Sequence, residues 1–215
     1  TEAFETDAQI SPKGRYVSFI REQNIFVLDL KSGKETQLTT DGQGLIKNGM
    51  AEFVAQEEMG RMTGYWWAPD DSKIAFSQID ESPVAEAVRN EIYADEIKLF
   101  NQRYPFTGTA NVKVKLGVVS VQQPAVQWID LGKEQDIYLA RVDWSKSASL
   151  LTYQWQSRDQ QQLELRLVDL VSQTERLLLK EHSATWINLH NDLYFLKDQK
   201  SFIWASERSG FKHLY

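Results

Sequence analysis

The chain has 215 residues, with 30 acidic and 24 basic side chains and a formal net charge of −6. Hydrophobic residues make up 42% of it and aromatic residues 12%, which is enough for a packed core and excludes an intrinsically disordered chain. The acidic balance, without a Lys/Arg cluster, argues against binding to nucleic-acid phosphates. No apolar run approaches the roughly 20 residues of a membrane-spanning helix. The absence of Cys excludes disulfides, thiolate catalysis and Cys-ligated zinc, and it fits both the cytosol and the periplasm.

Most of the chain shows an apolar period of two residues, which is typical of strands with one buried face. The first such stretch covers residues 15–20 and 24–30, and turn residues at 31–34 separate it from the next strand. The same layout of strand, turn and strand recurs to the end of the chain. It predicts four groups of antiparallel strands, at about residues 5–40, 63–130, 137–181 and 185–215.

A turn of one type precedes the second strand in three of these groups. It reads ISPKG at residues 10–14, WAPDD at 67–71 and WSKS at 144–147. Repeated four-stranded units are typical of a β-propeller, in which each blade buries its faces against its neighbours. A single antiparallel sandwich needs similar strands but no recurrent junction. The sequence therefore predicts an all-β fold, a partial β-propeller of about four four-stranded antiparallel blades.

Two stretches break the two-residue period. Residues 51–60 combine good helix formers with apolar positions and end at Gly60, which predicts a short helix. Residues 82–108 form a long insertion in the second blade, with a charged segment inside it. Insertions on a propeller project from one rim and reach a ligand or partner without disturbing the core. We expect a functional arm here, because the insertion is longer than a plain turn needs to be.

The chain contains no recognisable catalytic motif. It has neither the Gly-x-Ser-x-Gly elbow of serine hydrolases nor the Gly-x-Gly-x-x-Gly loop of phosphate and dinucleotide sites. Its three His residues are scattered, and the segment from His190 to Asp192 is expected to be a solvated hairpin tip rather than a pair of metal ligands. The sequence thus predicts no catalytic residue, no metal site and no cofactor within these residues.

The unusual feature is a pair of adjacent carboxylates, Glu57 and Glu58, on the predicted helix and close in sequence to Trp66 and Trp67. Adjacent helical residues point about 100° apart, so both can meet one ligand only near a helix end or rim. Two close carboxylates resist joint ionisation, and a cation relieves that repulsion. An ammonium group has three N–H donors and is satisfied by two or more carboxylate oxygens. The alternative is a solvated helix face, which is the ordinary setting of charged side chains.

Three blocks of sequence carry a family resemblance. They read EFVAQEEM at residues 52–59, GYWWAPDDSKIAF at 64–76 and RYPFTGTANVKV at 103–114. In order and approximate spacing they resemble the N-terminal propeller of the dipeptidyl peptidase IV family of prolyl serine peptidases, in its bacterial type. A weaker resemblance continues to SERSGFKHLY at 206–215. The family resemblance implies an eight-bladed propeller that caps an α/β-hydrolase domain. This chain begins at Thr1 rather than Met and is expected to be a fragment, with about half the blades and without the hydrolase domain.

The resemblance also implies a function. In that family a Glu pair on a propeller helix projects into the active-site cavity and binds the free α-amino group of a peptide whose second residue is Pro or Ala. Carried over by motif, the pair is Glu57 and Glu58. The expected role is a substrate-gating, amine-binding domain of a serine dipeptidyl peptidase that releases Xaa-Pro or Xaa-Ala dipeptides. The catalytic Ser, Asp and His belong to the hydrolase domain, so this chain is expected to be inactive alone.

Partners and compartment follow from the same resemblance. The expected partners are a peptide with a free N-terminus, the protein's own C-terminal hydrolase domain, and a second copy bound through the 82–108 arm. A periplasmic or secreted protein is favoured over a cytoplasmic one on this ground alone. The family's propeller Arg, which holds the substrate's backbone carbonyl, has no matching position, because Arg61 lies outside the pattern.

Two other functions stay open. The first is a non-enzymatic β-propeller that acts as a protein-interaction module, with Glu57 and Glu58 on plain surface and the arm gripping a partner. The lack of any hydrolase motif is consistent with this alternative. The second is a relative of endopeptidases or acylaminoacyl-peptidases. The two Glu residues argue against it, because blocked or internal peptides bring no ammonium group.

Overall fold

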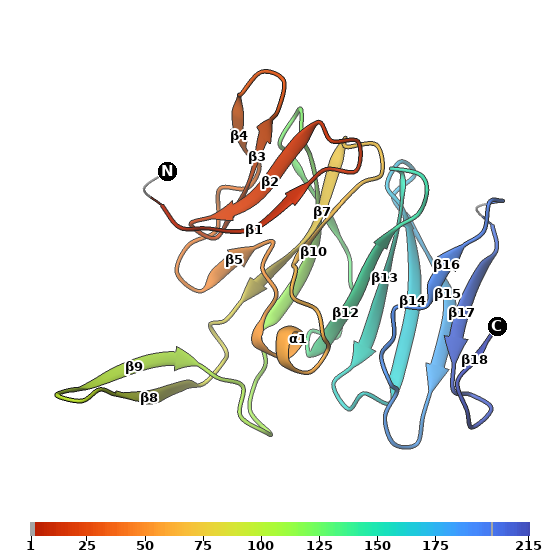
Figure 1. The fold of residues 1–215 in the computed structure, drawn as a ribbon. Coiled ribbons are helices and arrows are strands. Elements are labelled where there is room, and N and C mark those ends of the chain that lie inside the picture. Colours follow the sequence, from red (N-terminus) through yellow and green to blue (C-terminus); the bar gives the residue numbers. More distant parts are fainter. Residues whose placement is uncertain (1–2, 199) are drawn as a thin grey trace.

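The computed structural model describes residues 3–198 and 200–215. Within them the chain is almost entirely antiparallel β-structure, with one short helix, α1 (Phe53–Glu57). Figure 1 shows the larger sheets following one another in chain order, with α1 near the second and third. The predicted all-β fold of several antiparallel sheets is confirmed. No helix in these described ranges is both long and apolar enough to cross a membrane.

The first sheet has four strands in the order β1-β2-β3-β4. They are β1 (Glu5–Ile10), β2 (Tyr16–Arg21), β3 (Asn24–Asp29) and β4 (Glu35–Gln37). Only two residues, Glu22 and Gln23, connect β2 to β3, and both have positive φ (47° and 64°). Such a two-residue hairpin follows the twist of its strands, and it sets the register with Arg21 opposite Asn24.

The second sheet has five strands, one more than predicted, in the order β11-β10-β7-β5 with β6 also paired to β7. They are β5 (Ile46–Asn48), β6 (Tyr65–Trp67), β7 (Lys73–Asp80), β10 (Lys113–Ser120) and β11 (Val126–Ile129). β5 pairs with β7 around Ile79, and β6 pairs with it around Ala75. The outer strand is split in two because residues 49–64, which include α1, leave the sheet between its halves.

The third sheet has four strands in the order β12-β13-β14-β15: β12 (Ile137–Trp144), β13 (Leu150–Ser157), β14 (Gln162–Asp169) and β15 (Thr174–His182). The fourth has three in the described residues, rather than the predicted four: β16 (Leu193–Phe195), β17 (Phe202–Ser206) and β18 (His213–Leu214). Residues 183–192 form no strand there. The Ile187 N–H instead donates to the Gln160 carbonyl, in the β13–β14 turn (3.0 Å).

The insertion at residues 82–108 contains a two-stranded hairpin, β8 (Glu86–Ile92) paired with β9 (Ile97–Arg103). Figure 1 shows this hairpin projecting from the body of the chain. Its exposed large hydrophobic side chains are Val88, Ile92, Tyr93, Ile97, Leu99 and Phe100. A lone two-stranded hairpin is at best marginally stable in water, so these side chains suit a contact with another surface.

Buried side chains join each sheet to the next. One cluster, which includes Ile25 and Phe76, lies between the first and second sheets. Another, which includes Leu116 and Tyr153, lies between the second and third. Trp204 of β17 packs against the third sheet and joins the fourth to it. Successive sheets therefore share their cores, as the blades of a propeller do.

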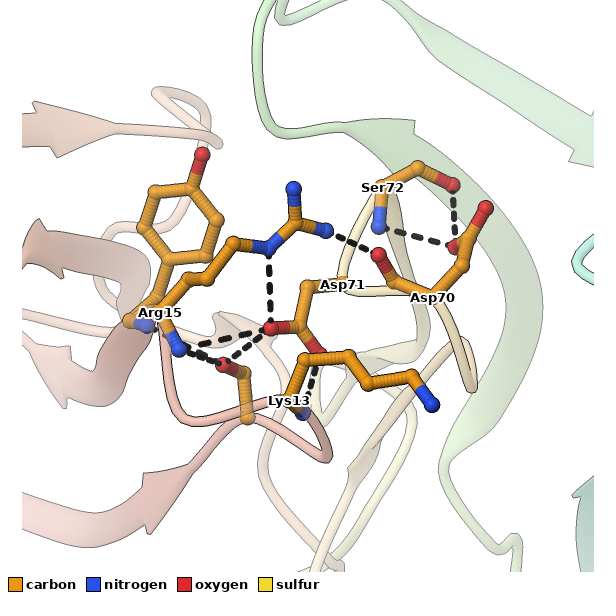
Figure 2. A network of polar contacts seen from close by, with 7 residues as sticks. Lys13, Arg15, Asp70, Asp71 and Ser72 are labelled. Atoms are coloured by element: carbon orange, nitrogen blue, oxygen red, sulfur yellow. Dashed lines mark hydrogen bonds and ion pairs between the residues drawn. The ribbon is translucent and has the colours of Figure 1, made fainter.

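The repeated junctions of the first two sheets meet in space (Figure 2). The buried Asp71 carboxylate accepts hydrogen bonds from the Ser11 hydroxyl (2.8 Å) and the Lys13 N–H (2.8 Å), and it pairs with Arg15 Nε (3.2 Å). Arg15 also donates to the Asp70 carbonyl. Burial by itself raises the pKa of Asp71, but these hydrogen bonds outweigh it, and the net pKa lies below the ordinary value. The first two of the similar turns seen in the sequence thus hold the first and second blades together.

Candidate functional site

Helix α1 lies on the segment that splits the outer strand of the second sheet, and it packs against the third sheet. Its buried residue Ala55, together with the flanking Ala51 and Met59, contacts Ala140 of β12 and Leu189 of the segment before β16. A five-residue helix is too short to be stable alone, so these contacts hold it in place. The neighbouring blade therefore sets the position of the helix.

Glu57 and Glu58, the two predicted substrate-binding residues, lie at the C-terminal end of this helix, and we call them the Glu pair. Glu57 is the last helical residue and Glu58 is the cap, so the helix is shorter than predicted. It ends here because Gly60 adopts a φ of +61°, after which the Arg61 N–H donates back to the Ala55 carbonyl (2.8 Å). At a helix end two adjacent side chains can reach a common ligand lying beyond it.

Both carboxylates are exposed, and neither forms an ion pair or hydrogen bond with another side chain in the described part of the chain. A depression of about 420 Å³ opens beside one of them, Glu58. The residues that line it come from α1 and its end, from the third sheet and from the segment before β16: Val54, Glu58, Met59, Gly60, Tyr138, Arg141, Gln156, Gln160, Trp186, Ile187, Asn188 and Leu189. Glu57 lies outside this lining, so the structure places only half of the pair at the depression.

Two polar groups of the depression are partly or fully buried. The Arg141 guanidinium donates to the Met59 carbonyl (2.9 Å) and to Asn191 Oδ1 (2.6 Å), which ties the helix end to β12. Burial, together with the nearby positive charge of Arg61, lowers the pKa of Arg141. The Gln156 amide nitrogen is buried without a partner.

Trp66 and Trp67 lie in the core rather than beside the Glu pair. The Trp67 indole N–H donates to the Ser18 hydroxyl (2.8 Å), and its ring stacks on Tyr16 with centroids 5.9 Å apart. The Trp66 carbonyl accepts the Trp144 indole N–H (2.9 Å). Both residues join blades to one another, so their closeness in sequence to the Glu pair does not make them part of its site.

Arg61, which the sequence left without a role, is buried behind the helix. Its Nη2 forms an ion pair with Glu52 Oε2 (3.2 Å) and donates to the Leu139 carbonyl of β12 (3.3 Å), while Nη1 donates to the Thr63 carbonyl (2.9 Å). Burial lowers the pKa of Arg61, and the charge of Glu52 opposes that effect. Sequence reasoning missed this pair because neither residue belongs to an apolar pattern or a catalytic motif. The only signal was the place of Glu52 at the start of its block.

His190 does not lie at a solvated tip, and that prediction was wrong. Its ring packs edge-on against Trp204, with centroids 4.4 Å apart, and its Nδ1 accepts the Asp192 N–H (3.1 Å). The side chain is only 12% exposed, and burial lowers the pKa of His190. Across residues 3–198 and 200–215, no group of three His, Cys, Asp or Glu side chains could hold a metal ion.

Antiparallel sheets that follow one another in chain order and share their cores define this chain as part of a β-propeller, with an inserted helix and arm. A family model described as the dipeptidyl peptidase IV (DPP IV) N-terminal region matches residues 1–215. The chain belongs to this family, as its three sequence blocks predicted.

Individual relatives agree with the family. The chain is 26% identical to dipeptidyl aminopeptidase A of Saccharomyces cerevisiae, over 97% of this chain and 24% of that protein. It is 28% identical to inactive dipeptidyl peptidase 10 of Mus musculus, over 84% of this chain and 23% of that protein. The solved structure of Porphyromonas gingivalis dipeptidyl peptidase 4 superposes with a TM-score of 0.91 at 28% identity, over all of this chain and 31% of that one. The chain thus spans about a quarter of the length of the curated relatives it matches.

Proposed function

We propose that this chain is the substrate-gating and amine-binding part of a serine dipeptidyl peptidase. The observation that carries the proposal is the Glu pair: two exposed carboxylates without a side-chain partner among the described residues, at the end of a helix that the next blade holds in place. Membership of the family, and relatives named dipeptidyl peptidases, support it. The proposed products are dipeptides with Pro or Ala as the second residue.

In this proposal the Glu pair recognises the free α-amino group of a peptide. An ammonium group brings three N–H donors and one positive charge. One charge pair at 4 Å and an effective dielectric constant of 20 contributes on the order of 4 kcal/mol before the cost of desolvation is subtracted. A peptide with a blocked N-terminus brings neither the donors nor the charge, so the pair selects free N-termini.

The pair also fixes where the peptide is cut. A hydrolase domain of the same protein supplies the catalytic Ser, and the span from the Glu pair to that Ser admits two residues. Holding a substrate at one end in this way is catalysis by positioning. The depression beside Glu58, at about 420 Å³, supports the proposal because it offers room for the first residue of the peptide.

Glu57→Gln and Glu58→Gln in the full-length protein test this function. Each substitution keeps the size of the side chain and removes one charge. We expect the KM for a free-amine Xaa-Pro substrate to rise about tenfold or more, which corresponds to about 1.4 kcal/mol of lost binding. Glu22→Gln, at an exposed turn of the first sheet, is the matched control and should leave KM unchanged. An unchanged kcat/KM in both Glu-pair variants would overturn the assignment.

A non-enzymatic interaction module is the second candidate function. Exposed hydrophobic side chains on the β8–β9 hairpin favour it, and one relative is named an inactive dipeptidyl peptidase. The discriminating measurement is hydrolysis of free-amine dipeptidyl substrates by the full-length protein. Absence of hydrolysis, together with a stable complex that is lost when the hairpin is removed, would favour the module.

We also infer that the β8–β9 hairpin joins two copies of the protein. Leu99→Asp places a charge on its apolar surface, where Leu99 is 72% exposed. The expected result is a shift from dimer to monomer in sedimentation of the full-length protein, because a charge in an apolar contact is costly to desolvate. Val171→Asp is the matched control, since Val171 is 79% exposed in a turn of the third sheet. A wild type that is already monomeric, or a Leu99→Asp variant that remains dimeric, would count against the inference.

A further inference from the structure

We propose that the buried Glu52–Arg61 ion pair is a positioning element for the Glu pair. It holds α1 against the third sheet, and it keeps the positive charge of Arg61 away from the two exposed carboxylates. The inference rests on the proposed function, because it concerns how the amine-binding residues are presented. Glu52 and Arg61 are positioning residues here, since neither touches the peptide.

The pair brackets the helix in sequence and is closed off from water. Glu52 directly precedes α1 and Arg61 follows its end, and their side chains are 7% and 5% exposed. Glu52 stands at the N-cap, but its side chain makes no capping hydrogen bond and reaches Arg61 instead. A buried charge is costly unless it is paired, so each of the two residues requires the other.

One guanidinium connects three segments of the chain. Arg61 reaches Glu52 before the helix, the Thr63 carbonyl before β6, and the Leu139 carbonyl of β12, which is 78 positions further along the chain. It also lies over the Trp66 ring, 5.7 Å from the centroid. Because the short helix has no stability of its own, these contacts set the distance and tilt of its end relative to the third sheet.

The second part of the inference concerns charge. The Glu pair stands at the C-terminal end of a helix, where backbone carbonyls add partial negative charge and no basic residue in the last turn offsets it. Arg61 and Arg141 both contact this segment, but within the described residues neither pairs with Glu57 or Glu58. Arg61 is held by Glu52, and Arg141 by the Met59 carbonyl and Asn191. The Glu pair therefore keeps its negative charge for an incoming ammonium group.

Removing the Glu52 charge alone is expected to affect KM differently from removing the charges of both Glu52 and Arg61. Without the Glu52 carboxylate, Arg61 becomes an uncompensated cation three residues after Glu58, and it competes with the substrate's ammonium group. Without both charges, the competitor is gone, and only the contacts that position the helix are lost. Glu52→Gln should therefore raise KM at least as much as the double variant Glu52→Leu/Arg61→Met.

The double variant in the full-length protein is the main test. Replacing a buried ion pair by apolar residues of similar size often leaves the fold intact. We expect kcat/KM for a free-amine Xaa-Pro substrate to fall about tenfold to a hundredfold, through KM, because the Glu pair is displaced from its productive position. The rate at which a fluorophosphonate labels the catalytic Ser should not change, since that reaction needs no ammonium group.

The matched control is an ion pair of the third sheet. Arg166 and Glu164 lie 2.6 Å apart at the closest nitrogen and oxygen, and their side chains are 21% and 11% exposed. The double variant Glu164→Leu/Arg166→Met should leave KM unchanged. A rise in KM in this control equal to that of the Glu52/Arg61 double variant would reduce the effect to general destabilisation, and the inference would be wrong.

The outcomes separate this inference from the proposed function. If Glu57→Gln and Glu58→Gln raise KM while the Glu52/Arg61 double variant does not, the positioning role fails and the proposed function stands. If the two Glu-pair variants leave KM unchanged, the proposed function itself fails. Should the double variant not fold, Arg61→Lys keeps the charge but loses the branched contacts. It should then show an intermediate KM with normal Ser labelling, and a wild-type KM would overturn the inference.

Discussion

Replacing Asp71 with Asn tests whether the junction in Figure 2 holds the first two blades together. The substitution keeps the shape of the side chain and suits the backbone, because Asn tolerates the left-handed conformation found there (φ +65°). It removes a negative charge from a side chain that is 0% exposed. The amide also offers only one acceptor oxygen to four donors, from Ser11, Lys13 and both the backbone N–H and Nε of Arg15.

The expected cost follows from those contacts. A hydrogen bond to a charged group contributes about 1.5–3 kcal/mol, and a neutral one about 0.5–1.5 kcal/mol. Asp71 accepts on Oδ1 from Lys13 and on Oδ2 from Ser11 and Arg15, so an Asn there loses at least one contact and weakens the others. Arg15 is 53% exposed, and its share is discounted for screening by water. The opening free energy of the first two blades should therefore fall by about 2–4 kcal/mol.

Hydrogen exchange followed by mass spectrometry on the full-length protein reads this local opening. Amides of β2 and β7 should exchange about 30-fold faster or more in the variant, which is the lower end of that range in free energy. Asp70→Asn is the matched control, because the exposed Asp70 side chain accepts hydrogen bonds within its own turn, from the Ser72 N–H (3.0 Å) and hydroxyl (2.6 Å). Equal exchange rates in the two variants would refute the argument.

Lowering the pH should protonate the Asp71 carboxylate and so reduce the stability of the fold. The folded-state pKa of Asp71 is lowered because hydrogen bonds to its ionised form outweigh burial. Its contribution to stability is therefore complete above the unfolded pKa of about 3.9 and is lost as the pH falls through the lower folded-state value. The Asp71→Asn variant lacks this part of the acid dependence. The difference in stability between wild type and variant should thus shrink below about pH 4, and a constant difference would contradict the assignment.

Two further substitutions probe contacts between distant segments. A Cβ on Gly64 would lie 2.4 Å from the Met50 carbonyl carbon, so Gly64→Ala should cost about 3 kcal/mol and lower the thermal unfolding midpoint. An unchanged midpoint would contradict the close approach of these backbones. Trp144→Phe removes the N–H donor to the Trp66 carbonyl and should cost about 1–2 kcal/mol, measured from the urea midpoint. Trp128→Phe, at a position 43% exposed, should cost less, and an equal loss would argue against the role of the hydrogen bond.

Local patterns in the sequence were sufficient to predict most of the strands and their grouping into sheets. Alternation of apolar residues identifies half-buried strands, and the repeated junctions mark where one blade gives way to the next. The same patterns could not predict that β5 joins the second sheet. That strand has only three residues, Ile46–Asn48, and it pairs with β7 at Gln78–Asp80, beyond the part of β7 that β6 covers. Three residues are too few to show an apolar period, so only the pairing with β7 shows that this segment is a strand of the second sheet.

The candidate site likewise has one part that the sequence predicts and another that it does not. Gly60 marks the end of the helix that carries Glu57 and Glu58, because a glycine readily adopts the positive φ that stops a helix. The roles of Trp66 and Trp67 were not readable in advance. Aromatic residues near a charged pair in sequence can face the ligand or the core, and here contacts with other blades place both in the core.

The sequence by itself determined the class of fold, the family, and the presence of two adjacent carboxylates on a short helix. Only the tertiary structure decided that both carboxylates are exposed and have no side-chain partner in residues 3–198 and 200–215, that Glu58 borders a depression, and that Glu52 and Arg61 neutralise each other behind the helix. The physical reason is the separation along the chain of the residues that interact. Periodicity reports how a residue faces its own strand or helix, whereas the placement of α1 depends on contacts with β12, such as the hydrogen bond from Arg61 to the Leu139 carbonyl, 78 positions further along the chain.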